Sequence, residues 1–438
     1  MRYLFLLMGI SVWGQTVNIP DAHFKAFCLE NYDTNDDGEI STAEAAAVTG
    51  TMDCGNREIS DLTGINAFTG LRYLDCDDNL LTNLPDLSAM TDLQSFDCDH
   101  NLLTNLPDLS ALTRLETLIC SYNQLTSLPD LSALTRLSAL HCNWNQLTSL
   151  PDLSTLTNLQ SLRFSWNQLT SLPDLSAFTS LYALHCSMNE LTSLPDLSAL
   201  TGLLFLSCSD NQLTSLPDLS ALTSLQQLSC RENQLTSLPD LSALTSLSSL
   251  HCSSNQLTSL PDLSASLDLE VLDCAWNQLA SLPDLSALTR LRSLYCRENQ
   301  LASLPDLSAS LDLEILDCYS NQLTSLPDLS TFFILNTLIC SDNKLRSLPD
   351  LSGSNLRVLH CASNLLTSLP ALPVLQQLVC DSNFLTEDSC PALNSFASSN
   401  YQQGKWLYSV HSEWPIFDVL GMVLLINRGG RYELNCGQ

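Results

Sequence analysis

The sequence predicts an α/β repeat solenoid, with a curved parallel β-sheet on its concave face, extended or 3₁₀ returns on its convex face, and a small helical N-terminal cap. Three observations predict this fold. A cysteine recurs in steps of 22 residues from Cys54 to Cys340, with Phe164 in its place once, a proline interrupts the segment between copies, and two helix-like segments precede the first copy. A chain of 438 residues would otherwise divide into several cores, whereas repeat units contact only their neighbours.

Charge and composition exclude several classes of protein. Lys and Arg number 17 against 47 Asp and Glu, which gives a formal net charge of −30. Such a chain is not a nucleic-acid binder that neutralises phosphates, nor a basic membrane-surface anchor. With 15% charged and 45% hydrophobic residues, it is also unlike a disordered chain.

Residues 1–14 have the form of a secretory signal peptide. One basic residue is followed by a short apolar run, and Val12 and Gly14 occupy the −3 and −1 positions of a cleavage site. We therefore expect an exported protein, secreted or at the cell surface, that begins near Gln15. No other stretch approaches the ~20 apolar residues of a membrane span.

Residues 15–50 are expected to form the helical cap, with helices over residues 20–32 and 41–48. The loop between them, Asp33 to Glu44, matches the twelve-residue EF-hand pattern, with Gly38 at its sharp turn. Oxygen ligands at these positions suit calcium, and an empty capping turn is the alternative. The predicted metal ligands are Asp33, Asn35, Asp37, Glu39 (through its carbonyl) and Glu44, with Ser41 acting through water.

Residues 51–383 carry about sixteen copies of L-x-x-L-x-C-x-x-N-x-L, the leucine-rich-repeat signature. Leu140 and Cys142 alternate with His141 and Asn143, so this segment is a short strand with Leu and Cys facing inward. Stacking such strands at ~4.8 Å buries a leucine column. The recurring asparagine is expected to bond backbone groups inside each turn.

Fifteen cysteines occupy the inward column, and we expect buried reduced thiols there because neighbouring Cβ atoms lie beyond disulfide reach. Cys28, Cys390 and Cys436 lie outside the column, and Cys28 could form a disulfide with Cys54. Thirteen aspartates follow Leu-Pro in the returns. We expect them to cap turns, with a row of bound cations as the alternative.

The outward strand positions vary, which locates the candidate binding surface on the concave face. One row of outward residues, and a smaller second group, are predicted to bind the ligand; packing between neighbouring side chains is the alternative. The row is Tyr122, Trp144, Trp166 and Met188 beside His141, Arg163 and His185, and the second group is Trp276, Tyr295, Arg297, Glu298 and Tyr319. An acidic patch, either a solvated face or a site for a cation or basic partner, comprises Asp53, Asp75, Asp77, Asp78, Asp97 and Asp99, with His100 beside it.

The repeats resemble the 22-residue repeats of bacterial internalins, in Asn123-Gln124 and in Leu134-Thr135 of the return. The N-terminal segments IPDAHFKAF and ISDLTGINAFTGL, with the EF-hand-like loop, resemble modules of exported leucine-rich-repeat proteins of Bacteroidetes-type bacteria. The resemblance implies a secreted or surface-displayed ligand binder. Cysteine in the last strand position departs from the internalin pattern, so no internalin partner is implied.

Residues 384–438 are expected to form a C-terminal cap and tail. Phe417 to Leu425 is weakly similar to a motif of type IX sorting domains, and an edge strand explains it equally well. About 55 residues follow the repeats, too few for the ubiquitin-ligase domain of a bacterial effector, and no nucleophile, base and orienting group are recognisable together.

The predicted function is therefore noncatalytic binding of a protein or a glycan on the concave face, by a monomer that does not bind nucleic acid. A structural surface spacer or adhesin scaffold is the main alternative, and an enzymatic effector is a weaker one.

Overall fold

The computed structural model describes residues 15–370 and 375–385. The predicted signal peptide, Cys390, Cys436 and the tail from residue 386 lie outside the described residues. The described chain divides into two units, one ending at Leu191 and one beginning at Thr192.

Two helices open the N-terminal unit, as the sequence predicts. Helix α1 (Ala22–Tyr32) begins after Asp21, whose carboxylate accepts the N–H groups of His23 and Phe24. Helix α2 (Thr42–Ala47) begins after Ser41, which forms a reciprocal capping box with Glu44. The caps thus fix both helix starts.

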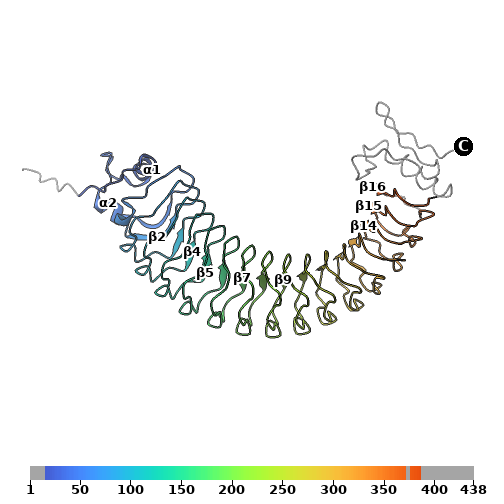
Figure 1. The fold of residues 1–438 in the computed structure, drawn as a ribbon. Helices are drawn as coiled ribbons and strands as arrows, with labels where there is room; N and C mark the ends of the chain where they lie inside the picture. Colours follow the sequence, from blue (N-terminus) through green and yellow to red (C-terminus); the bar gives the residue numbers. More distant parts are fainter. Residues whose placement is uncertain (1–14, 371–374, 386–438) are drawn as a thin grey trace, which may run out of the picture. The chain divides into compact units, whose positions relative to one another are not determined.

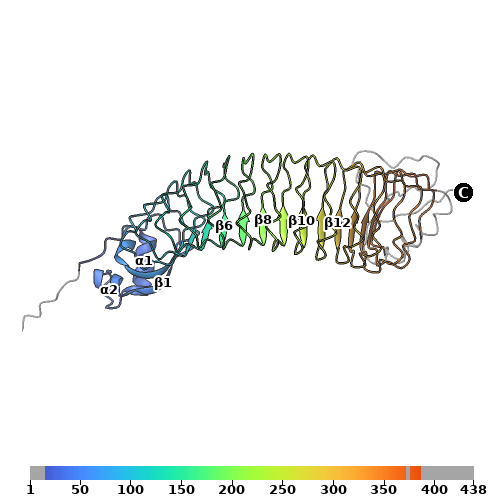
Figure 2. The ribbon, with the colours of Figure 1, turned by 90° about the horizontal axis from the view of Figure 1, so that it is seen from below.

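Short parallel strands follow, one from each repeat, with a single short 3₁₀ helix η1 (Ile65–Ala67) before the second (Figures 1 and 2). The strands of the N-terminal unit are β1 (Thr49–Asp53), β2 (Gly70–Asp75), β3 (Ser95–Asp97), β4 (Thr117–Ile119), β5 (Ala139–His141), β6 (Ser161–Arg163) and β7 (Ala183–His185). Those of the C-terminal unit are β8 (Phe205–Ser207), β9 (Gln227–Ser229), β10 (Ser249–His251), β11 (Val271–Asp273), β12 (Ser293–Tyr295), β13 (Ile315–Asp317), β14 (Thr337–Ile339), β15 (Val358–His360) and β16 (Gln377–Val379).

Register is constant from repeat to repeat within each unit, apart from a shift between Gly50 and Thr51 in the β1–β2 pair. Leu140 of β5 lies opposite Leu162 of β6, and His141 lies opposite Arg163. Equivalent residues therefore form straight columns along the sheet. The inward columns of leucine and cysteine are buried, and the outward side of the strands, which we call the strand face, carries the variable residues.

The asparagine column satisfies the backbone inside each turn, as predicted. The Asn145 side-chain oxygen accepts the N–H of Leu125 at 2.9 Å. Its amide nitrogen donates to the carbonyls of Cys120, Cys142 and Asn143 at 2.9, 3.2 and 3.1 Å. One buried side chain thereby pairs four backbone groups in two neighbouring repeats, which is why the residue recurs.

The cysteine column also matches its prediction. The column cysteines are thiols, and burial raises the pKa of the Cys142 thiol to about 12. The Cys142 thiol donates to the carbonyl of Arg163 at 3.5 Å. Cys28 and Cys54 are thiols as well, so the disulfide considered for the cap is not present.

The thirteen return aspartates cap turns, as the sequence predicts. In each, one carboxylate oxygen accepts the N–H of the serine two residues later, at 2.8–2.9 Å. These hydrogen bonds lower the pKa of carboxylates such as Asp130. The row's negative charge is thus compatible with turn formation in every repeat.

Candidate functional site

The aromatic residues of the predicted row follow the strands in a left-handed backbone conformation. Tyr122, Trp144 and Trp166 have φ values of 51°, 53° and 60°. The N–H of Trp144 donates to the carbonyl of Ser165, and the N–H of Asn145 to the carbonyl of Trp166, so neighbouring repeats hold this turn identically. Their side chains consequently occupy one column on the strand face.

Four rings of this column form one continuous stack. The centroids of His100 and Tyr122 are 4.1 Å apart, those of Tyr122 and Trp144 5.3 Å, and those of Trp144 and Trp166 3.7 Å, with planes 12–13° from parallel. We call His100, Tyr122, Trp144 and Trp166 the aromatic stack. The geometry is therefore compatible with both interpretations of the row, ligand binding and packing between neighbouring side chains, because the rings pack on one another and also contact solvent.

The stack keeps substantial solvent contact despite its internal packing. Tyr122, Trp144 and Trp166 are 43%, 38% and 41% exposed. Neighbouring rings cover the faces of Tyr122 and Trp144 from both sides, so mainly ring edges meet the solvent. An exposed apolar row of this kind is typical of a surface that another molecule covers.

His100 belongs to the aromatic column, although its charge and neighbours in the sequence predict a place in the acidic patch. Its ring joins the stack, and its Nδ1 lies 3.1 Å from a carboxylate oxygen of Asp99. The signal was present in the sequence, because His100 follows Cys98 by the same two residues that separate Tyr122 from Cys120.

The remaining predicted residues of the row lie beside the stack. The His141 ring nitrogen Nε2 lies 3.0 Å from Ser161 Oγ, and the Arg163 Nε donates to the same hydroxyl at 3.3 Å. Burial, followed by the charge of Arg163 and then His185, lowers the pKa of His141 to about 4. His141 is therefore neutral at pH 7. The last predicted residue of the row, Met188, is half-buried at the end of the column.

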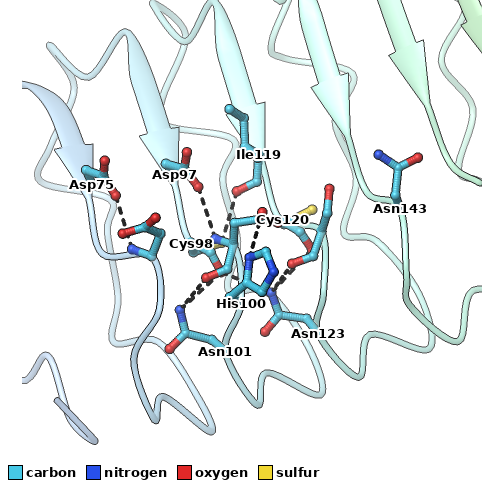
Figure 3. Close-up of polar contacts among 12 residues, drawn as sticks. Asp75, Asp97, Cys98, His100, Asn101, Ile119, Cys120, Asn123 and Asn143 are labelled. Carbon is cyan, nitrogen blue, oxygen red and sulfur yellow. Dashed lines mark hydrogen bonds and ion pairs between the residues drawn. The ribbon is translucent and has the colours of Figure 1, made fainter. Parts of the chain in front are cut away.

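The acidic patch adjoins the His100 end of the stack, and Figure 3 shows Asp75, Asp97 and His100 on neighbouring repeats. Asp75 and Asp97 lie directly opposite each other in β2 and β3. Burial, followed by neighbouring carboxylates, raises the pKa of Asp77 to about 6. Burial and the charges of nearby aspartates also raise the pKa of Asp97 to about 6, although a hydrogen bond from the backbone N–H of Asp99 acts in the opposite direction. Two carboxylates ~5 Å apart repel by about 3 kcal/mol at an effective dielectric constant near 20.

The second predicted group is less closely assembled. Trp276 is 52% exposed and, among the described residues, stacks on no other ring. Its neighbour Arg297 turns to Asp317, with Nη1 3.4 Å from a carboxylate oxygen. Tyr295 and Tyr319 lie on adjacent repeats without ring contact to Trp276. This group therefore offers single side chains, not a stack.

An ionic network that was not predicted from the sequence lies on the strand face of the C-terminal unit. Arg231 Nη2 lies 2.9 Å from Asp273 and 2.7 Å from His251 Nδ1, and Ser253 donates to Asp273 at 3.0 Å. Asp273 is 8% exposed. An arginine just after one cysteine and an aspartate just before another, two repeats later, is the pattern that would have revealed this network.

The EF-hand-like loop has the predicted helices on both sides. One Glu44 carboxylate oxygen accepts the N–H and hydroxyl of Thr34, and the other accepts those of Ser41. These bonds, led by the Ser41 N–H, lower the pKa of Glu44 to about 2. Asp33 accepts the N–H groups of Asp37 and Gly38.

In the described part of the chain, no three His, Cys, Asp or Glu side chains converge as a metal site would require. The oxygens of Glu44 are committed to protein donors, so the loop does not present a preformed cage. Calcium binding remains a prediction from the loop's spacing.

Fold and site together define a class: a solenoid of short parallel-strand repeats that displays a variable strand face. The family described as "Leucine Rich repeats (2 copies)" matches residues 113–155, 201–243, 223–265 and 289–331. The functional domain of InlJ from Listeria monocytogenes is 31% identical over 81% of this chain and 77% of that one, with a TM-score of 0.61. The chain belongs to the leucine-rich-repeat family.

Two further solved structures are similar. YopM from Yersinia enterocolitica WA-314 is 37% identical, over 76% of this chain and 69% of that one, with a TM-score of 0.68. The ectodomain of the Arabidopsis thaliana receptor kinase GASSHO1/SCHENGEN3, in complex with Casparian strip integrity factor 2, is 26% identical over 82% and 53%, with a TM-score of 0.56. No curated protein matches the chain.

One expectation is corrected by these comparisons. The InlJ structure includes a cysteine ladder. The cysteine column therefore does not separate this chain from proteins of internalin type, contrary to the expectation from the sequence.

In the described residues, no helix has the length and apolar character needed to span a membrane.

Proposed function

We propose that this chain is a secreted or cell-surface protein that binds a protein ligand, without catalysis, on the strand face of its N-terminal unit. The aromatic stack is the observation that carries the proposal. Large, exposed, mutually supported rings lose little conformational entropy on binding, which is why aromatic side chains dominate the energetics of protein interfaces.

The geometry of the stack favours a protein ligand over a glycan. Sugars that bind aromatic residues lie flat against ring faces, but the faces of Tyr122 and Trp144 are covered by neighbouring rings. Ring edges are free to pack against apolar side chains and peptide groups. A continuous edge of four rings therefore suits a protein surface better than a saccharide chain.

The comparisons support the same class of ligand. The plant receptor ectodomain was determined in complex with Casparian strip integrity factor 2. The signal-like segment at residues 1–14 supports export.

The test is affinity capture with the full chain and with Trp144→Ala/Trp166→Ala. We expect wild type to capture a discrete protein from host or community extracts and the double variant to lose most of it. Phe333→Ala, which removes a ring that is 66% exposed away from the strand face, is the matched control and should capture normally.

Two results would count against the proposal. Capture that is unaffected by the double variant places the ligand elsewhere, and selective binding on a glycan array that depends on Trp166 favours a saccharide. Light scattering separates the spacer alternative, because a self-associating scaffold would lose its oligomeric mass in the double variant without any other ligand.

A further inference from the structure

The aromatic stack and the acidic patch form one surface. Asp78 and His100 occupy the same column as the other rings, each two residues after a strand cysteine and each with a left-handed backbone, at φ 46° and 47°. Asp99 then joins the patch to the stack through its contact with the His100 ring at 3.1 Å. A ligand that covers the ring edges at this end therefore also meets carboxylates.

The charge of this patch is not neutralised within the described part of the chain. No lysine or arginine there forms an ion pair with any of its six aspartates. The basic residues of the N-terminal unit that do form ion pairs contact other acids: Lys25 pairs with Glu39, Arg57 with Glu30 and Arg114 with Asp92.

In the C-terminal unit, by contrast, aspartates on the strand face do form ion pairs with arginines. There, Asp273 and Asp317 occupy the same strand position as Asp75 and Asp97, directly before the cysteine. Each has an arginine from the same unit, with Arg231 at 2.9 Å from Asp273 and Arg297 at 3.4 Å from Asp317. The same fold thus accommodates neutralising arginines, and the acidic patch has no such ion pair.

We propose that the partner of this surface is a basic protein segment, which places Lys or Arg side chains on the aspartates of β1–β3 and apolar side chains against the edges of the aromatic stack. This inference rests on the proposed function and names the partner's chemistry. Opposite charges across an interface select the partner and accelerate its association. Burial, and then neighbouring carboxylates, raise the pKa values of Asp77 and Asp97, and a cationic side chain placed beside them would relieve the carboxylate repulsion that contributes to these shifts.

The experiment uses a random twelve-residue peptide display library selected on the full-length chain. Peptides that survive are expected to be enriched in Lys and Arg and to contain apolar residues. They should bind Asp75→Asn/Asp97→Asn at least about tenfold more weakly than wild type, and weaken with added salt. Trp144→Ala/Trp166→Ala should weaken the same peptides.

Matched variants exclude indirect effects. Asp130→Asn/Asp152→Asn removes the same charge from the return side, where both carboxylates cap turns, and should leave peptide binding unchanged. Asparagine keeps the side-chain oxygen that accepts the N–H of Asp77 or Asp99, so the patch variant should fold and be at least as stable as wild type.

The outcomes separate this inference from the proposed function. Peptides without a basic bias that depend only on the tryptophans would overturn the basic-partner inference and leave the proposed function standing. Peptides that depend on neither pair of residues would overturn both. Equal competition by spermine and by the selected peptides, at equal charge, would show a general polycation site and would also overturn a protein segment as the partner.

Discussion

The indole rings of Trp144 and Trp166 lie 3.7 Å apart, centroid to centroid, with planes inclined by 12°. They belong to adjacent repeats and are brought together by the strand register that places His141 opposite Arg163. Their spacing is shorter than the ~4.8 Å between strands, so the rings lean toward each other. A 22-residue period has thus placed two residues distant in sequence in face-to-face contact.

Such close indoles couple electronically, and the coupling is measurable. Wild-type protein should show an exciton couplet in its far-ultraviolet circular dichroism, and Trp166→Ala should abolish it. Trp276→Ala removes an indole from the equivalent position of a repeat in the C-terminal unit, where it stacks on no described ring, so the couplet should persist in that variant. Identical spectra for all three proteins would contradict the stack.

The asparagine column makes a strong prediction about stability. Asn145→Ala leaves one buried N–H and three carbonyls without the side chain that pairs them. We expect a loss of about 2–4 kcal/mol in the free energy of unfolding, measured with urea, because unpaired buried polar groups keep their desolvation cost. Asp130→Ala, which removes an exposed turn cap, should cost clearly less, and comparable losses would contradict the structural role assigned to the column.

Calcium should stabilise the cap if the EF-hand-like loop binds it. For a dissociation constant of 10⁻⁴–10⁻³ M, 10 mM calcium should add roughly 1.4–2.7 kcal/mol to the stability of the folded cap. Calorimetry on the full chain checks this. Glu44→Gln keeps a side chain suited to the capping box but lowers the ligand charge, and should abolish the binding heat. An absence of heat from wild type at millimolar calcium would reject the site.

The histidines of the strand face should show a pH dependence with a defined sign. The folded-state pKa of His141, about 4, lies below its ordinary value of 6.5, so the unfolded chain takes up the proton first. His141 therefore costs stability as the pH falls from 6.5 toward 4.

An NMR titration of the His141 imidazole should have its midpoint near pH 4, and Arg163→Met should raise it by removing a nearby positive charge. His141→Asn should lose less stability than wild type over the same interval. A midpoint at 6.5 would mean that the ring is solvated rather than buried beside Ser161.

Much of the fold follows from local chemistry and could be predicted. Each inward column has one structural role: Leu140 fills the core, Cys142 is a small apolar thiol, and Asn145 pairs backbone groups. These columns could therefore be inferred from the repeat alone. The helix starts at Asp21 and Ser41 followed from the same kind of local rule.

The site was only partly predictable because its contacts depend on side-chain rotamers. The row from Tyr122 to Trp166 was foreseen, but the stacking distances were not, and His100 was assigned by charge instead of by column. In the C-terminal unit, Arg231 reaches Asp273 across two repeats, a contact set by the length of the arginine side chain and not by the 22-residue period.

The backbone bonds of the asparagine column also bear on how the gene can change. Because Asn145 and Asn167 make the same set of contacts in neighbouring copies, duplication or deletion of one whole copy within a unit leaves each remaining copy with an equivalent neighbour. Length is therefore open to variation by unequal recombination. Shorter copies are also accommodated, because Leu338, Leu359 and Leu378 remain directly opposite one another although the last copies are shorter than 22 residues. Lineages carrying this chain should differ by integral numbers of copies.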